Sequence, residues 1–122
     1  MPKVELRVEF LFSAAHRLPF YEGPCFRMHG HNYKLLVSVE REVVPATGMV
    51  MDFEELRKQV WDYALDRCDH HTLNDFLENP TAENIIVWIW NELSPKIPGL
   101  KELVLFETPE YSVVYRGDSD EG

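Results

Sequence analysis

Two stretches of this chain alternate between apolar and polar side chains, and this alternation restricts the fold more than any other feature. Over residues 3–12, apolar side chains occupy the even positions from Val4 to Phe12, and charged side chains occupy the odd positions from Lys3 to Glu9. Over residues 32–44, apolar side chains occupy the odd positions from Tyr33 to Val39. Because successive side chains of a strand point to opposite faces, both stretches predict strands with one buried face.

Two stretches with helical spacing follow these strands. Asp52 and Glu55 resemble a capping box, which predicts a helix over residues 53–66. Thr81 is the predicted N-cap of a second helix over residues 82–94. This second helix is apolar around most of its circumference, so we expect it to be buried on more than one side or at a subunit contact. The remaining predicted elements are short strands at 102–107 and 112–117 and loops at 18–28 and 67–80.

The predicted order of elements is strand, strand, helix, helix, strand, strand. Segregated hairpins and helices are typical of an α+β fold. We expect an antiparallel four-stranded sheet with both helices packed on one face. The length of 122 residues suits one domain, which we place at 1–117 with an acidic tail at 118–122.

The composition excludes several classes of partner. The formal net charge of −9 disfavours a nucleic-acid binder, which needs a basic face to neutralise phosphates. No apolar stretch approaches the roughly 20 residues of a membrane helix, so we expect no membrane partner. The first residues lack the layout of a signal peptide, which predicts a cytoplasmic protein with reduced thiols.

All five histidines fall in two clusters, one of which continues the strand alternation. His16 continues the even, apolar positions of the first strand, and His29 and His31 continue the odd positions of the second. If the strands pair antiparallel, the three imidazoles emerge on one side at one end of the sheet. Three neutral imidazoles are the ligand set of a catalytic zinc with an open fourth position. The alternative is one core histidine beside an incidental His-Gly-His loop.

Four other residues are candidate functional residues, although their sequence patterns are less specific than that of the three histidines. Cys25 lies four residues before His29 and is a fourth zinc ligand, a reactive thiol or a packed apolar side chain. Asp69 beside His70 either tunes a proton transfer or caps a loop next to a surface histidine. Glu107 ends an apolar strand and either binds a ligand edge with two parallel N–H donors or faces solvent.

Taken together, these residues resemble the 6-pyruvoyl-tetrahydropterin synthase family, in particular its 6-carboxy-tetrahydropterin-forming branch of queuosine synthesis. The resemblance covers nearly the whole chain, through six motifs in order. These motifs lie at residues 12–18, 25–31, 47–53, 69–74, 79–84 and 106–108. The family's fold is the tunnelling fold, in which subunits close into barrels and two rings stack. The resemblance therefore implies a homo-oligomer, a hexamer built as a dimer of trimers.

The resemblance also implies roles for individual residues. Zn²⁺ would be the cofactor, held by His16, His29 and His31. Cys25 would transfer protons, assisted by Asp69 and His70 from the same or a neighbouring subunit. Glu107 would anchor the amino-pyrimidine edge of a pterin, with Thr81 and Glu83 near the same pocket. Arg27 and Arg17 are the weaker candidates for phosphate contacts, because Pro24 stands where many relatives carry lysine. We assign Cys68 to packing.

The implied reaction converts 7,8-dihydroneopterin triphosphate, a small-molecule substrate, to 6-carboxy-5,6,7,8-tetrahydropterin, acetaldehyde and triphosphate. Three residues separate Cys25 from His29, which resembles the carboxy-forming branch, whereas the pyruvoyl-forming enzymes usually have a longer insert. One alternative is a pyruvoyl-tetrahydropterin synthase, which only eliminates triphosphate. Another is a non-enzymatic zinc-binding protein in which Cys25 is the fourth ligand.

Overall fold

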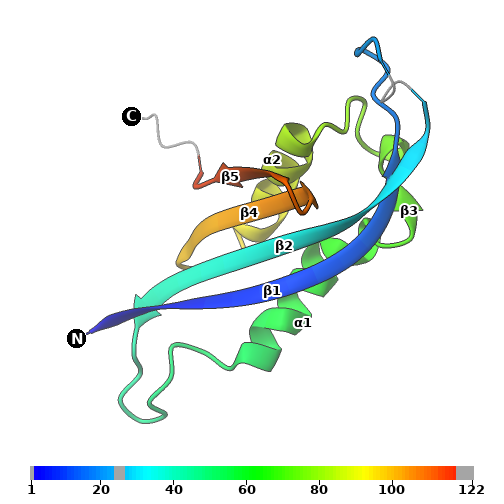
Figure 1. Ribbon diagram of the computed structural model, residues 1–122. Helices are drawn as coiled ribbons and strands as arrows, with labels where there is room; N and C mark the ends of the chain where they lie inside the picture. The colour runs from blue at the N-terminus through cyan, green and yellow to red at the C-terminus, as the bar shows by residue number, and fades with distance from the viewer. Residues whose placement is uncertain (1, 24–26, 118–122) are drawn as a thin grey trace.

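The computed structural model describes residues 2–23 and 27–117. Over these residues, one mixed sheet of five strands carries two α-helices on one face (Figure 1). The elements in chain order are β1 (Lys3–His16), β2 (His29–Glu42), α1 (Phe53–Tyr63), β3 (His71–Thr72), α2 (Ala82–Leu93), β4 (Leu100–Thr108) and β5 (Tyr111–Tyr115). The strands are ordered β3-β1-β2-β4-β5 across the sheet. The α+β class and the order of the four long strands and two helices are as predicted.

The sheet differs from the predicted four antiparallel strands by one short addition. β3 lies inside the stretch 67–80 that we expected to be a loop, and it pairs in parallel with Ala14 and Ala15 of β1. Two residues are too short to show any periodicity, so the sequence carries no signal for this strand. The first helix also ends at Tyr63 instead of residue 66, because the chain tightens into a single 3₁₀ turn at Leu65–Arg67.

The register between β1 and β2 follows from the alternation of their side chains. The two strands pair antiparallel without interruption from Lys3 opposite Glu42 to His16 opposite His29. In this register the even positions of β1 and the odd positions of β2 share one face. The even positions from Val8 to Ala14 and the odd positions from Tyr33 to Val39 are buried in the core under the helices. A slip of one residue would turn one strand's apolar side chains to the other face, so burial fixes the pairing.

The two helices begin at the predicted capping residues. An Asp52 side-chain oxygen accepts a hydrogen bond from the Glu54 N–H at 3.0 Å, and the Thr81 hydroxyl accepts one from the Asn84 N–H at 3.1 Å. Neither of the helices described is long and apolar enough to cross a bilayer.

Helix α2 is buried on more than one side, as its sequence predicts. One face contributes Ile85, Ile86, Ile89 and Leu93 to the core. Outside this face, the rings of Trp90 and Tyr115 lie 5.5 Å apart in an edge-on contact, and the rings of Trp88 and Phe76 lie 4.7 Å apart. These contacts explain the apolar circumference of α2 within one subunit.

Both long edges of the sheet are open over the described residues. The outer side of β1 pairs with β3 only at Ala14 and Ala15, so most of its 14 residues present unpaired backbone groups. The outer side of β5, at the opposite edge, pairs with no described strand. Open edges are templates for pairing with another chain.

We therefore predict that the protein self-associates in solution through these edges. Sedimentation equilibrium at micromolar concentration should give a mass that is a multiple of the 14.3 kDa chain. A single 14.3 kDa species that persists across a concentration series would contradict the prediction.

Candidate metal centre and substrate pocket

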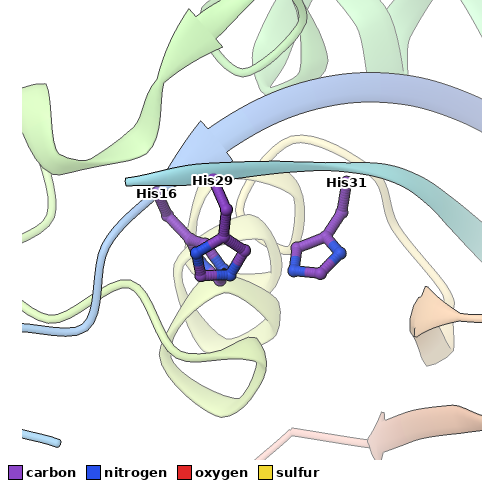
Figure 2. Close-up of side chains that lie close together, drawn as sticks. All are labelled: His16, His29 and His31. Carbon is purple, nitrogen blue, oxygen red and sulfur yellow. The ribbon is translucent and has the colours of Figure 1, made fainter. Parts of the chain in front are cut away.

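Three histidines meet at one end of the sheet. His16 is the last residue of β1 and lies opposite His29, the first residue of β2, while His31 lies opposite Ala14. Their imidazoles extend from the same side of the two strands and point toward one another (Figure 2). One ring nitrogen from each histidine lies within 4.8 Å of the others. The structure thus brings together the three side chains that the alternation placed on one face.

Backbone carbonyls fix the tautomers of two of these histidines. The Nδ1 atom of His16 lies 2.7 Å from the Pro80 oxygen, and the Nδ1 atom of His29 lies 2.7 Å from the Arg27 oxygen. Because a carbonyl oxygen only accepts, each Nδ1 carries the proton, and each neutral ring presents a lone pair at Nε2. These two Nε2 atoms are 3.0 Å apart. Two lone pairs at this distance repel unless a proton or a metal cation lies between them.

Burial disfavours a proton between the two Nε2 atoms as the way to relieve their repulsion. His16 is fully buried, and this desolvation lowers its pKa, as does the neighbouring His29. Burial also lowers the pKa of His31. The Nε2 atom of His31 is buried and makes no hydrogen bond with any described residue. The three ring nitrogens lie close enough together to hold a metal ion, and the Nδ1 bonds of His16 and His29 leave the Nε2 atoms of these two rings as ligands.

Glu107, near the end of β4, lies beside the histidines. Its Oε2 atom is 3.6 Å from His16 Nε2 and 3.8 Å from His31 Nε2. Glu107 also lines a cavity of about 250 Å³ together with Ala82, Glu83, Tyr111, Ser112 and Val113. Glu83, whose side chain is exposed, shares this cavity, whereas the hydroxyl of Thr81 is engaged as the cap of α2. The carboxylate of Glu107 thus joins the histidine cluster to a pocket.

Asp69 and His70 lie together outside the histidine cluster of the same chain, although His70 and His31 both line one cavity of about 370 Å³. Asp69 accepts a hydrogen bond from the Ser13 N–H at 2.9 Å, and its other carboxylate oxygen lies 3.6 Å from His70 Nε2. Both residues line a cavity of about 390 Å³ with Ser13 and Asn32. Ser13 and Asn32 alternate with Ala14 and His31 along their strands, so this cavity opens on the opposite face of the sheet.

The other predicted residues divide into three groups. Cys25 lies outside the described residues. Arg27 and Arg17 are exposed, and the Arg27 carbonyl is the acceptor for His29. Cys68 is buried in the core, and this burial raises the pKa of its thiol to about 12, which agrees with packing and not with nucleophilic chemistry.

Two groups that touch His16 were absent from the sequence prediction. The Tyr33 hydroxyl lies 3.3 Å from His16 Nδ1, and burial raises the pKa of this phenol. The strand alternation places Tyr33 on the histidine face, which was the available signal. The Pro80 carbonyl belongs to the backbone, and no side-chain pattern identifies such an acceptor.

Comparison with known proteins identifies relatives of this chain. The sequence profile of the 6-pyruvoyl tetrahydropterin synthase family matches residues 5–118. The chain is 41% identical to a 6-carboxy-5,6,7,8-tetrahydropterin synthase of Synechocystis, over 82% of this chain and 83% of that protein. It is equally 41% identical to a dihydroneopterin monophosphate aldolase of Pyrococcus furiosus, over 84% and 88% of the two chains.

The fold has a close counterpart among solved structures. The 6-pyruvoyl tetrahydropterin synthase of Caenorhabditis elegans superposes with a TM-score of 0.86, at 31% identity, over 96% of this chain and 97% of that chain. The human 6-pyruvoyl tetrahydrobiopterin synthase is 37% identical over 88% of this chain and 87% of its own length.

The lowered pKa values predict how the metal-free protein responds to acid. The unfolded chain takes up a proton near the ordinary histidine pKa of 6.5, before folded His16 and His31 do. Above this pKa the two histidines do not reduce the free energy of unfolding. As the pH falls below it, protonation favours the unfolded chain, and the free energy of unfolding decreases. Urea unfolding of EDTA-treated protein should show a lower free energy of unfolding at pH 5 than at pH 8.

His31→Gln should reduce this loss, because it removes one of the two histidines whose pKa is lowered by burial. If wild type and His31→Gln lost equal free energy of unfolding between pH 8 and pH 5, the lowered pKa of His31 would not be the cause of the acid sensitivity.

Proposed function

This chain belongs to the 6-pyruvoyl tetrahydropterin synthase family, and we propose that it is a zinc-dependent lyase of that family. In the proposed reaction, 7,8-dihydroneopterin triphosphate and one water molecule give 6-carboxy-5,6,7,8-tetrahydropterin, acetaldehyde and triphosphate. The observation that carries the proposal is the meeting of three metal-binding imidazoles with a carboxylate that also lines a cavity. The similarity to the Synechocystis enzyme supports this choice of product.

Zn²⁺ is the proposed metal, and His16, His29 and His31 are its proposed ligands. Imidazole nitrogens suit zinc, and three protein ligands leave a fourth position open, which is typical of catalytic sites. A bound zinc ion supplies Lewis-acid polarisation of substrate oxygens. The chain's own contribution is to hold two Nε2 lone pairs 3.0 Å apart, because both Nδ1 protons are committed to carbonyls.

Glu107 is the proposed anchor for the pterin. A carboxylate accepts two parallel N–H donors, and the amino-pyrimidine edge of a pterin offers that pattern. Glu83 also lines the cavity beside Glu107. Thr81, the N-cap of α2, is the proposed neighbour of the bound ring. Since Glu107 lies 3.6 Å from His16 Nε2, a pterin on this carboxylate is held next to the metal ligands. Arg27 is the proposed contact for the triphosphate.

Cys25 is the proposed proton carrier, and Asp69 and His70 are proposed to tune its charge. Asp69 and His70 line a cavity on the sheet face opposite the histidine cluster of their own chain. We therefore propose that each site takes this pair from a neighbouring subunit. Open edges at β1 and β5 support a closed assembly, and a hexamer of two stacked trimers is the proposed form.

The reaction can be tested by product analysis. Incubation with 7,8-dihydroneopterin triphosphate should release triphosphate and acetaldehyde in equal amounts, with a 6-carboxy-tetrahydropterin mass. Alcohol dehydrogenase coupling measures the acetaldehyde, and mass spectrometry identifies the pterin. Triphosphate without acetaldehyde, together with a pyruvoyl-pterin mass, would replace the proposal with a 6-pyruvoyl tetrahydropterin synthase. Dihydroneopterin monophosphate belongs in the same assay, because the aldolase relative is equally similar.

A Cys25→Ala variant separates the enzyme from a non-enzymatic zinc protein. If the thiol carries protons, the variant should keep its zinc and its fold but lose turnover by about 100-fold or more, the range for general acid–base catalysis. If Cys25 is instead a structural ligand, zinc affinity and stability should fall together. Zinc loss in this variant would therefore contradict the catalytic role.

A further inference from the structure

The hydrogen-bond acceptor that orients His16 is part of the backbone just before α2. His16 Nδ1 donates to the Pro80 oxygen at 2.7 Å, and both residues are buried. An acceptor on the far nitrogen of a ligating histidine sets both its tautomer and the direction of its metal-binding lone pair. The position of the Pro80 carbonyl therefore matters to the metal centre, and what holds this carbonyl is a separate structural question.

A tight turn centred on Pro80 holds the carbonyl. The Thr81 N–H donates to the Asn79 oxygen at 2.9 Å, two residues back, which is the hydrogen bond of a γ-turn. The fixed backbone angle of proline suits the centre of such a turn. The side-chain amide of Asn84 donates to the same Asn79 oxygen at 2.8 Å. Both lone pairs of the Asn79 carbonyl are then engaged, and the next carbonyl along the chain, that of Pro80, bonds His16.

Asn84 occupies the position where a capping box would place a different side chain. Thr81 caps α2, so Asn84 is the third helical residue, where a capping box places Glu or Gln as an acceptor for the N-cap N–H. Here the Thr81 N–H already donates to the Asn79 oxygen, so an acceptor side chain at position 84 could not form the capping-box hydrogen bond. The side chain instead donates, and it donates to the turn that carries the Pro80 carbonyl.

We infer that Asn84 is a positioning residue for the metal centre: its side-chain amide fixes the γ-turn whose Pro80 carbonyl orients His16. The inference rests on the proposed zinc site. Asn84 is exposed and acts at a distance, through Asn79, Pro80 and His16 in turn. Its role is thus distinct from that of a helix cap, because the cap of α2 is the Thr81 hydroxyl bonded to the Asn84 backbone N–H.

Two substitutions at Asn84 separate positioning of His16 from stability of the helix. Asn84→Ala removes the amide donor. Asn84→Asp keeps the shape, removes the donor and places a negative charge in the first turn of α2, where the helix dipole favours it. Asn91→Ala is the matched control, since Asn91 is exposed on the same helix. The affinity for Zn²⁺ is measured by competition with a chelator, and the visible absorption of bound Co²⁺ reports the ligand geometry.

Both Asn84 variants should bind Zn²⁺ about tenfold more weakly than wild type, at the low end of the range for residues that support metal ligands. Their Co²⁺ spectra should shift, while Asn91→Ala matches wild type. Thermal unfolding of the metal-free Asn84→Asp protein should match wild type, which separates the effect from loss of fold. Wild-type affinity and spectrum in Asn84→Asp would overturn the inference and leave the proposed function intact. Failure of the wild type itself to bind Zn²⁺ would overturn both.

Discussion

The register between β1 and β2 is the constraint on which the rest of the site depends. It places His16 directly opposite His29 and sets His31 opposite Ala14, so three imidazoles share one face at one end of the sheet. The same register packs Phe12 against Tyr33, whose ring centroids are 5.0 Å apart. Core packing and metal-site geometry therefore depend on the same strand register, because a slip of one residue would remove both. A histidine cluster built on two paired strands is also held more rigidly than one built on loops.

The electrostatics of the cluster favour a cation and disfavour an added proton. Carbonyls commit the Nδ1 protons of His16 and His29, which leaves two Nε2 lone pairs 3.0 Å apart. Burial lowers the pKa of His16 and of His31, so protonation cannot relieve the repulsion cheaply. Unmet buried nitrogens cost stability in the metal-free chain. Buried polar atoms that lack hydrogen bonds, and so reduce stability, are typical of ligand-binding sites.

Much of this arrangement could be predicted from the sequence, because it follows from alternation. The even-numbered face of β1 and the odd-numbered face of β2 predicted both the buried core and the meeting of His16, His29 and His31. The short strand β3 could not be predicted, since two residues show no period and their pairing depends on where β1 runs. The role of the Pro80 carbonyl as hydrogen-bond acceptor for His16 could not be predicted either. Every residue carries a carbonyl, and only the tertiary fold determines which one lies next to His16. The placement of Asp69 and His70 on the opposite face also required the structure, since the sequence alone did not say which face a loop covers.

X-ray absorption at the zinc edge of the purified, zinc-loaded protein determines directly whether three imidazoles and no thiolate hold the metal. An open site of three histidines should give a first shell of nitrogen and oxygen atoms at about 2.0–2.1 Å with the outer-shell signature of three imidazoles, and no sulfur. The His31→Ala protein should lose one imidazole from this signature. A sulfur shell at about 2.3 Å would contradict the open, three-histidine site and would indicate a closed centre with a thiolate ligand.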